Sequence, residues 1–453
     1  MAHRVYLQSL GCPKNLVDSE QMLGLVARGG AEIVLNPEDA DVLVVNTCGF
    51  IGEAKKESIE AILELAELKQ GAPRKRLIVT GCLVQRYGAE LQQSLPEVDG
   101  FLGTGDFTRL PELLDGADTA DASGYGGAAH VLPNLDVPRA RSGHFFSAYL
   151  KVSEGCDHRC SFCIIPKIRG RHESKPIDRV VAEAETLVDD GVVELNLIAQ
   201  DLTAYGKDRR DGSSLSSLLR RLCRIDGLRW IRLLYTYPRY VSDELLDTIA
   251  GEPQVCGYID MPLQHVSDAM LSRMRRERSG AAVRRLIDRM RQRVPGLALR
   301  TAFIVGFPGE TEADFAELMA FVSEARLDHV GVFRYSREEG TEAGAMSGQI
   351  PAAVKQQRYQ RLMTAQSRVA AELNRLQVGS VQPVLVCGQD PRARWYGRTP
   401  KQAPDIDGVV YLAAPAEPGT IVPVAISDAT IYDLEGTAQT AVETPVDTAM
   451  DSL

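Results

Sequence analysis

The sequence contains no apolar run long enough to cross a membrane. No stretch approaches the ~18 to 20 consecutive apolar residues that a spanning helix needs, and the first residues, Met-Ala-His-Arg-Val-Tyr, lack a signal-peptide core. We therefore expect a cytoplasmic protein. Apolar residues still make up 44% of the 453 residues, so the chain can bury ample hydrophobic surface, and its length predicts about three domains.

The sequence also lacks an excess of positive charge. Its formal net charge is −10, which argues against an interface built on general attraction to nucleic-acid phosphates, because such binding depends on clustered Lys and Arg. A basic protein partner fits better, and residues 376–442 follow the same trend with four basic and seven acidic side chains. One local exception mixes basic and aromatic residues and could either stack on RNA or form a solvated loop. It comprises Arg392, Arg394, Trp395, Tyr396, Arg398 and Lys401.

The cysteine count does not suit a disulfide framework. Nine is an odd number, and a reducing compartment would keep these residues as thiols or metal ligands. Cys223, Cys256 and Cys387 have no partners at metal-ligand spacing in the sequence, so we interpret them as ordinary thiols. The other six cysteines form two groups of three.

The first group follows strand-like runs in an N-terminal segment that alternates strand and helix patterns. Strands predicted at 5–10, 41–47 and 76–80 lead directly to Cys12, Cys48 and Cys82. Each thiol alone would be read as a buried core residue. Because the carboxyl ends of parallel strands meet at one edge of a sheet, we expect the three to converge there and to ligate an iron–sulfur cluster.

The rest of the chain predicts two further folded units. Strand and helix patterns alternate again from residue 148, and six predicted strands indicate an open, partial (β/α)6 barrel. These strands are expected at 148–152, 193–198, 230–234, 258–261, 299–305 and 330–335. A long helix at 352–377 then leads to short β runs that predict a small antiparallel β-barrel. Those runs lie at 381–386, 408–412, 421–426 and 429–433.

The fold class is therefore α/β multidomain, with boundaries set by changes in periodicity. We expect an N-terminal parallel α/β domain at 1–116, a Gly- and Pro-rich linker at 117–141 and the barrel at 142–374. The small β-barrel at 375–443 and a frayed tail at 444–453 complete the expected order.

The second group of cysteines has a diagnostic spacing. Cys156, Cys160 and Cys163 form C-x3-C-x2-C directly after a predicted strand. Three thiolates on one loop can hold three irons of a [4Fe-4S] cluster and leave the fourth iron open to a small molecule. The alternative is a zinc site or three buried thiols. Zinc sites with four ligands usually show two separated pairs, and the sequence has no second C-x2-C pair.

This loop resembles that of the radical S-adenosylmethionine superfamily. The resemblance implies that S-adenosylmethionine chelates the open iron and is cleaved by one electron to a 5′-deoxyadenosyl radical. Such a radical abstracts hydrogen from an unactivated carbon, which acid–base chemistry alone does not readily do.

Nearly the whole chain is similar to the methylthiotransferase family, which combines a three-cysteine domain, a radical S-adenosylmethionine core and a C-terminal β-barrel called TRAM. The matching stretches are 10–20, 45–51, 80–83, 261–265 and 304–311. This resemblance implies two [4Fe-4S] clusters: that of Cys156, Cys160 and Cys163 makes the radical, and the other supplies or carries the inserted sulfur. A second S-adenosylmethionine provides the methyl group.

Residues 14–20 and 235–238 look like the branch of this family that modifies ribosomal protein. That resemblance implies methylthiolation of the β-carbon of an aspartate in small-subunit ribosomal protein S-twelve, free or on the ribosome. It also implies a sulfur donor and a reductant such as flavodoxin or ferredoxin. The alternatives are a transfer RNA adenosine methylthiotransferase and a non-catalytic iron–sulfur carrier.

A few further residues follow strands where a cofactor would lie. We expect Gln200 and Asp201 to meet polar parts of S-adenosylmethionine, and Gly306 and Gly309 either to line the cofactor or to form a simple turn. Three other residues each have two interpretations: His265 is either functional or a hydrogen-bonded structural histidine, and Arg169 and Arg171 either pair with a substrate carboxylate or belong to a solvated turn. The sequence identifies no catalytic side chain.

Overall fold

The N-terminal unit is a five-stranded parallel sheet with helices on both faces. The computed structural model describes residues 3–70, 72, 74–114, 137–276 and 279–439; the predicted tail and most of the predicted linker lie outside these ranges. The strand order is β2-β1-β3-β4-β5. The strands are β1 (Arg4–Ser9), β2 (Glu32–Ile33), β3 (Val42–Thr47), β4 (Arg76–Gly81) and β5 (Gly100–Leu102). The short β2 and β5 were not predicted.

Successive side chains of β3 point to opposite faces of the sheet, which explains why helices cover both faces. Val42 and Val44 pack with the helices of one face, and Leu43 and Val45 pack with those of the other. All six residues of β3 are buried, which is typical of a parallel strand covered on both sides. The helices are α1 (Pro13–Arg28), α2 (Gly52–Gln70), α3 (Cys82–Ser94) and α4 (Leu110–Leu114).

The central unit is a six-stranded, open, parallel sheet whose spatial order follows the sequence. The strands are β6 (Ser147–Lys151), β9 (Glu194–Ile198), β10 (Trp230–Leu233), β11 (Val255–Asp260), β12 (Ala298–Val305) and β13 (His329–Arg334). They match the six predicted strands, although β11 begins at Val255, three residues earlier than expected. The partial (β/α)6 barrel predicted from the sequence is thus confirmed.

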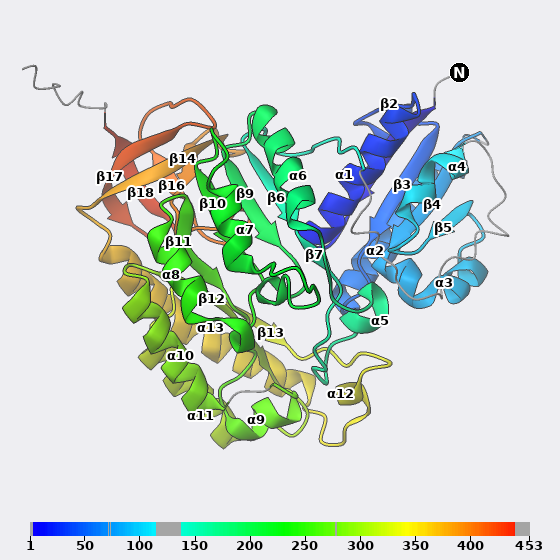
Figure 1. Ribbon diagram of the computed structural model, residues 1–453. Coiled ribbons are helices and arrows are strands. Elements are labelled where there is room, and N and C mark those ends of the chain that lie inside the picture. Colours follow the sequence, from blue (N-terminus) through cyan, green and yellow to red (C-terminus); the bar gives the residue numbers. More distant parts are fainter. Residues whose placement is uncertain (1–2, 71, 73, 115–136, 277–278, 440–453) are drawn as a thin grey trace, which may run out of the picture.

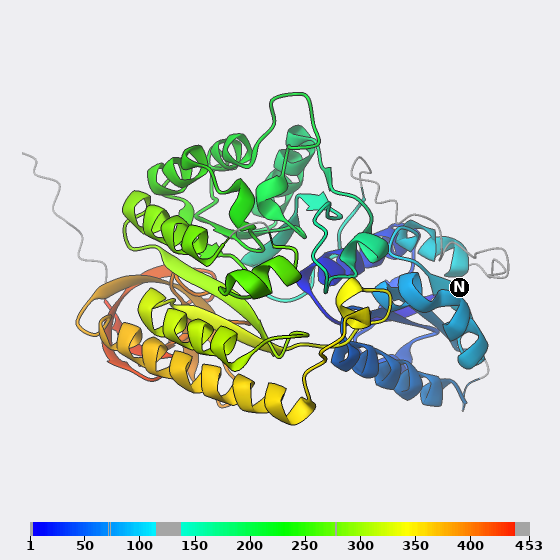
Figure 2. The ribbon, with the colours of Figure 1, turned by 90° about the horizontal axis from the view of Figure 1, so that it is seen from below.

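Helices follow the strands of the central sheet and pack on its outer face. They are α6 (Ile177–Asp189), α7 (Leu215–Leu222), α8 (Asp243–Gly251), α10 (Gly280–Arg293), α11 (Glu312–Ala325) and α13 (Ala352–Arg375). In Figure 2 the long α13 runs along the outside of this unit toward the C-terminal strands. No helix in the described ranges combines the length and hydrophobicity that a membrane crossing requires.

The C-terminal strands close into a five-stranded barrel of order β14-β15-β16-β18-β17. They are β14 (Val381–Gln389), β15 (Trp395–Arg398), β16 (Val410–Leu412), β17 (Ile421–Ala429) and β18 (Leu434–Ala438). The sequence missed β15, and of the strand expected at 429–433 only Ala429 lies in a strand, at the end of β17, while 430–433 form a bend that precedes β18. Pairing is antiparallel except between β16 and β18. Closure leaves no free sheet edge.

The N-terminal unit and the C-terminal barrel lie at opposite ends of the central unit (Figure 1). Buried ion pairs join the C-terminal barrel to the central sheet. Glu194 of β9 lies 3.0 Å from Arg232 and 2.5 Å from Arg398 of β15. Although burial opposes ionisation, these two cations keep the pKa of Glu194 far below its usual value. Arg398 therefore points inward, so the basic and aromatic loop is less basic at its surface than its sequence indicated.

Candidate iron–sulfur and cofactor site

Cys12, Cys48 and Cys82 converge at the carboxyl edge of the N-terminal sheet. Cys12 directly precedes α1, Cys48 follows β3, and Cys82 begins α3 immediately after β4. The approach is close: a side chain at Gly11, whose φ is +92°, would place its Cβ 2.8 Å from the Cβ of Cys48. The parallel topology therefore gathers three thiols that are 34 or more residues apart in sequence.

Cys156, Cys160 and Cys163 lie on the loop between β7 (Ser153–Glu154) and α5 (Ile165–Arg169). Backbone hydrogen bonds shape this loop: the Cys156 amide donates to the Gly170 carbonyl at 3.1 Å, and the Cys163 amide donates to the Cys160 carbonyl at 3.1 Å. The loop is thus closed on itself at the carboxyl side of the central sheet, where the motif was expected.

Both groups of cysteines line one cavity of about 340 Å³, which we call the cysteine cavity. Its wall consists of Gly11, Cys12, Lys14, Cys48, Phe50, Cys82, Cys156, His158, Cys160, Phe162, Cys163, Ile165, Arg169, Gln200, Tyr235, Thr236, Tyr237, Pro262, Gln264 and Arg276. The N-terminal unit and the central barrel each contribute three thiols. The cysteine cavity therefore brings together two potential cofactor sites that are 74 or more residues apart in sequence.

The chemistry of these thiols fits iron–sulfur clusters. All six are free thiols, and burial raises the pKa of Cys82, Cys156 and Cys163 to about 12. Such thiols ionise at neutral pH only when a metal supplies compensating positive charge. In the described ranges, no three potential ligands are gathered tightly enough around one point for a single metal ion; the thiols stand around a chamber instead.

One buried polar atom in the wall also fits an added ligand. The side-chain nitrogen of Gln200 donates to Glu154, whereas its oxygen Oε1 is buried without a hydrogen-bond partner. A buried acceptor of this kind is costly unless a ligand satisfies it. An N–H donor, such as the amino group of S-adenosylmethionine, would do so.

Strained backbone and a buried cation lie on the same wall. Tyr235 and Gln264 adopt φ values of +62° and +73°, a conformation that costs about 1–3 kcal/mol for residues other than glycine and that concentrates at functional sites. The Lys14 ammonium lies 2.9 Å from the centroid of the Tyr235 ring. Burial lowers the pKa of Lys14 to about 8.

A buried network of four charges joins the two units behind the cavity. Arg169 of α5 lies 2.6 Å from Asp18 of α1 and 3.4 Å from Glu154, and Lys151 lies 2.7 Å from Glu154 and also contacts Asp18. Two cations thus balance two anions. Arg169 additionally donates to the Cys82 sulfur at 3.4 Å, so a residue of the central unit touches a thiol of the N-terminal unit. We call this set the four-charge network.

The other expected cofactor residues have different surroundings. Asp201 accepts from the Ala204 amide at the start of a short 3-10 helix and lies 2.6 Å from the His158 ring nitrogen, so it positions the loop that carries Cys156, Cys160 and Cys163, which we call the cluster loop after its expected ligand. Gly306 and Gly309 are not part of the cavity wall. Both have positive φ values, and the Gly306 amide donates to Glu310, as in the simple turn that was the alternative.

The remaining sequence-based assignments resolve into structural roles or surface positions. His265 is fully buried between Glu310 and the Ser267 amide. Arg171 is 91% exposed in its side chain, and Arg169 belongs to the four-charge network. Cys256 and Cys387 are buried between the central sheet and the C-terminal barrel. Cys223 packs against the hydrophobic core of the central unit.

Sequence reasoning missed the polar residues that surround the cavity. Lys14 and Asp18 lie four residues apart, so both fall on one face of α1. That spacing was a usable signal. Lys151 ends β6 and Glu154 ends β7, with no pattern that marks either, and Arg276 lies beyond any motif.

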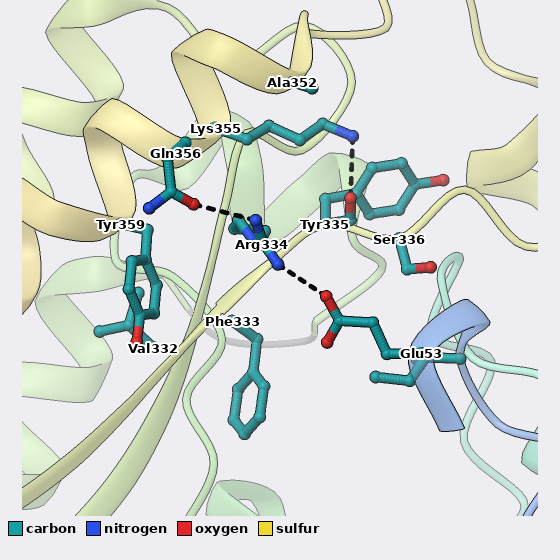
Figure 3. Close-up of a pocket in the computed structure, with 11 residues that line it drawn as sticks. Glu53, Val332, Phe333, Arg334, Tyr335, Ser336, Ala352, Lys355, Gln356 and Tyr359 are labelled. Carbon is teal, nitrogen blue, oxygen red and sulfur yellow. Dashed lines mark hydrogen bonds and ion pairs between the residues drawn. The ribbon is translucent and has the colours of Figure 1, made fainter. Parts of the chain in front are cut away.

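A larger cavity, of about 630 Å³, lies beside β13 and does not have this character (Figure 3). Its polar side chains are bonded to one another: Arg334 lies 2.6 Å from Glu53 and donates to Gln356 at 2.9 Å, while Lys355 donates to the Tyr335 carbonyl. It contains no cysteine. Cavity size alone therefore does not identify the site.

Comparison with known proteins agrees with this architecture. Three family models match in order: "Uncharacterized protein family UPF0004" at residues 4–103, "Radical SAM superfamily" at 150–322 and "TRAM domain" at 378–438. Two solved structures share the fold. The radical S-adenosylmethionine methyltransferase TsrM from Kitasatospora setae aligns with a TM-score of 0.56 and 17% identity over 84% of this chain and 81% of its own. The cobalamin-dependent radical enzyme OxsB gives 0.52 and 12% over 81% and 56%.

Curated relatives are similar over almost the full length. The protein named ribosomal protein uS12 methylthiotransferase RimO from Syntrophotalea carbinolica is 51% identical, with 96% of each chain covered. Its namesake from Geotalea uraniireducens is 50% identical over 96% of this chain and 98% of its own. The resemblance seen in the sequence is confirmed: the chain belongs to the RimO family of radical S-adenosylmethionine methylthiotransferases.

Proposed function

We propose that this protein methylthiolates the β-carbon of an aspartate in small-subunit ribosomal protein S-twelve. The observation that carries the proposal is the single cysteine cavity, because both thiol groups face it. Cys156, Cys160 and Cys163 would hold a [4Fe-4S] cluster with one iron open to S-adenosylmethionine. Cys12, Cys48 and Cys82 would hold the second cluster.

The bound cofactors would supply radical removal of hydrogen from an unactivated carbon, the inserted sulfur and its methyl group. The chain supplies the surroundings for this chemistry. The Gln200 side-chain oxygen would accept from the amino group of S-adenosylmethionine, and Asp201 holds the loop through His158. Lys14 and Arg276 place positive charge on the wall, where they attract the carboxylate of the target aspartate.

The surface of the C-terminal barrel favours a protein substrate over transfer RNA. Of the four basic residues at 376–442, Arg398 is buried against Glu194. Arg394 pairs with Asp390 at 2.8 Å and lies over the Tyr411 ring at 3.7 Å. Of the seven acidic residues in the segment, Asp407 is buried beside Arg300 and Asp390 is the partner of Arg394. Five acidic residues remain against Arg392 and Lys401, so this barrel suits a basic ribosomal protein better than a polyanion. Action on that substrate would require a location in the cytoplasm, with an external sulfur donor and reductant as partners.

The decisive test is the mass of the target in a deletion strain. Ribosomal protein S-twelve should lack the methylthio increment, and the wild-type gene should restore it. Cys160→Ala and Cys48→Ala should each fail to restore it, whereas Cys223→Ala, a matched control far from the cavity, should succeed. An increment on transfer RNA adenosine with none on the ribosomal protein would contradict the proposal and establish the second candidate substrate.

A further inference from the structure

A second cavity, of about 440 Å³, lies against the outer side of the cluster loop. We call it the basic cavity. It is lined by Asp157, His158, Arg159, Tyr237, Arg239, Tyr240, Ser272, Arg275 and Arg276. Four arginines therefore face one aspartate, in a protein whose net charge is −10. Such a local reversal of charge attracts an acidic partner.

Only a thin layer of side chains separates this cavity from the thiols. His158, Tyr237 and Arg276 line both the basic cavity and the cysteine cavity. The His158 ring stacks on Tyr237 with 3.7 Å between centroids, and the Arg276 guanidinium lies 4.1 Å from the centroid of the same Tyr237 ring. Arg276 Nη1 is 3.6 Å from the Cys160 sulfur. The path from the outer cavity to a cluster thiol is thus continuous packed contact.

The charges at the rim are presented to solvent. Arg159 and Arg239 are exposed, and Lys207 adds a further positive group 5.9 Å from the centroid of the Tyr240 ring. Arg275 pairs with the exposed Glu342 at 2.9 Å, which leaves its own side chain 53% exposed. The rim therefore offers cations around aromatic rings, a surface that pairs with carboxylates at the edge of a partner.

We propose that the basic cavity is the docking site of an acidic one-electron carrier protein, such as one with a flavin hydroquinone. This inference rests on the proposed function, which consumes an external electron. On docking, one electron would leave the hydroquinone, which becomes a semiquinone, and pass by way of the wall of Tyr237 and Arg276 to the cluster that Cys156, Cys160 and Cys163 would hold, which is thereby reduced by one electron. The thin wall distinguishes this partner from RNA, since binding of phosphates does not require closeness to a redox centre.

The test uses reconstituted holoenzyme and purified flavodoxin. The variant is the double replacement Arg159→Glu with Arg239→Glu, which reverses two rim charges, and the matched control is Arg368→Glu, an exposed arginine of α13. Two quantities are measured: the Kd for oxidised flavodoxin at about 50 and about 300 mM salt, and the ratio of 5′-deoxyadenosine formation with flavodoxin hydroquinone to that with dithionite. Dithionite is small and does not need the surface.

The double variant should bind flavodoxin about tenfold or more weakly at low salt, with the difference shrinking at high salt. Its ratio of flavodoxin-driven to dithionite-driven product should fall by a similar factor, while Arg368→Glu stays within about twofold of wild type on both measures. An unchanged Kd and ratio would overturn the proposal. The proposal would also be overturned if the double variant lost affinity for polyuridylate alone, or if its KM for the ribosomal protein were raised. If wild-type enzyme makes no 5′-deoxyadenosine even with dithionite, the proposed function fails instead.

Discussion

Replacing Arg169 by Met should weaken the association of the N-terminal unit with the central unit. Arg169 is buried between Asp18 and Glu154. Its loss leaves two carboxylates facing one ammonium, that of Lys151, inside the protein. Removing one partner of a buried ion pair costs about 3–5 kcal/mol, because the remaining charge is neither solvated nor compensated. We expect a loss of that size in the free energy of unfolding. The hydrogen bonds of Arg169 are part of the same cost and are not added to it.

The assay is urea unfolding of the reduced, metal-free protein, combined with tryptic cleavage of the N-terminal unit. A protein of several units does not unfold in one step, so the first transition is the one to compare. Arg171→Met is the control: its partner Asp157 lies 3.4 Å away in a solvent-exposed pair, which contributes at most about 1 kcal/mol. Adding Asp18→Asn to Arg169→Met restores charge balance and should recover part of the loss. A shift below about 1 kcal/mol for Arg169→Met would refute the reasoning.

Three further predictions concern the cofactors and pH. Reconstituted protein should hold about eight irons and Cys48→Ala about four, as measured by iron analysis; a wild-type value near four would remove the second cluster. Gln200→Leu should weaken S-adenosylmethionine binding about tenfold in equilibrium dialysis, because the orphaned acceptor is lost; an unchanged Kd would contradict its assignment. Burial raises the pKa of Glu154, but the attraction of Lys151 and Arg169 outweighs burial and lowers this pKa from 4.5 to about 2. The stabilisation that ionised Glu154 contributes is therefore complete above about pH 4.5 and is lost as the pH falls toward about 2. Glu154→Gln should flatten the pH dependence of the free energy of unfolding across that window. An unaltered slope would count against the four-charge network.

The sequence predicted those parts of the fold that depend on local pattern. Buried parallel strands such as β3 are long apolar runs, and the cysteines at their ends converge because the topology leaves no other edge for them. Two of the short strands that escaped prediction are β5, with three residues, and β15, with four, and each contains a glycine, a residue that is depleted in strands. The equally short β10 and β16 contain no glycine and were predicted. Side-chain pairs between units were also hidden, since Asp18 and Lys151 are 133 residues apart.

Residues near a motif were harder to assign than the motif itself. Gly306 and Gly309 follow a strand as a cofactor loop would, but the Gly306 amide is satisfied by Glu310 within the same turn. Arg398 appeared to belong to a surface loop, and only the three-dimensional contact with Glu194 shows that it faces inward. A sequence reveals which residues are polar, whereas their direction depends on partners far along the chain.

The modest volume of the cysteine cavity limits what can be modified. In the proposed function this volume of about 340 Å³ also has to hold two clusters and S-adenosylmethionine, so only the end of a substrate side chain could enter beside them. We therefore expect the choice of substrate to depend on shape. An aspartate at the tip of a protruding, stiff loop can extend its β-carbon into the cysteine cavity. We expect aspartates on flat surfaces or within helices to escape modification.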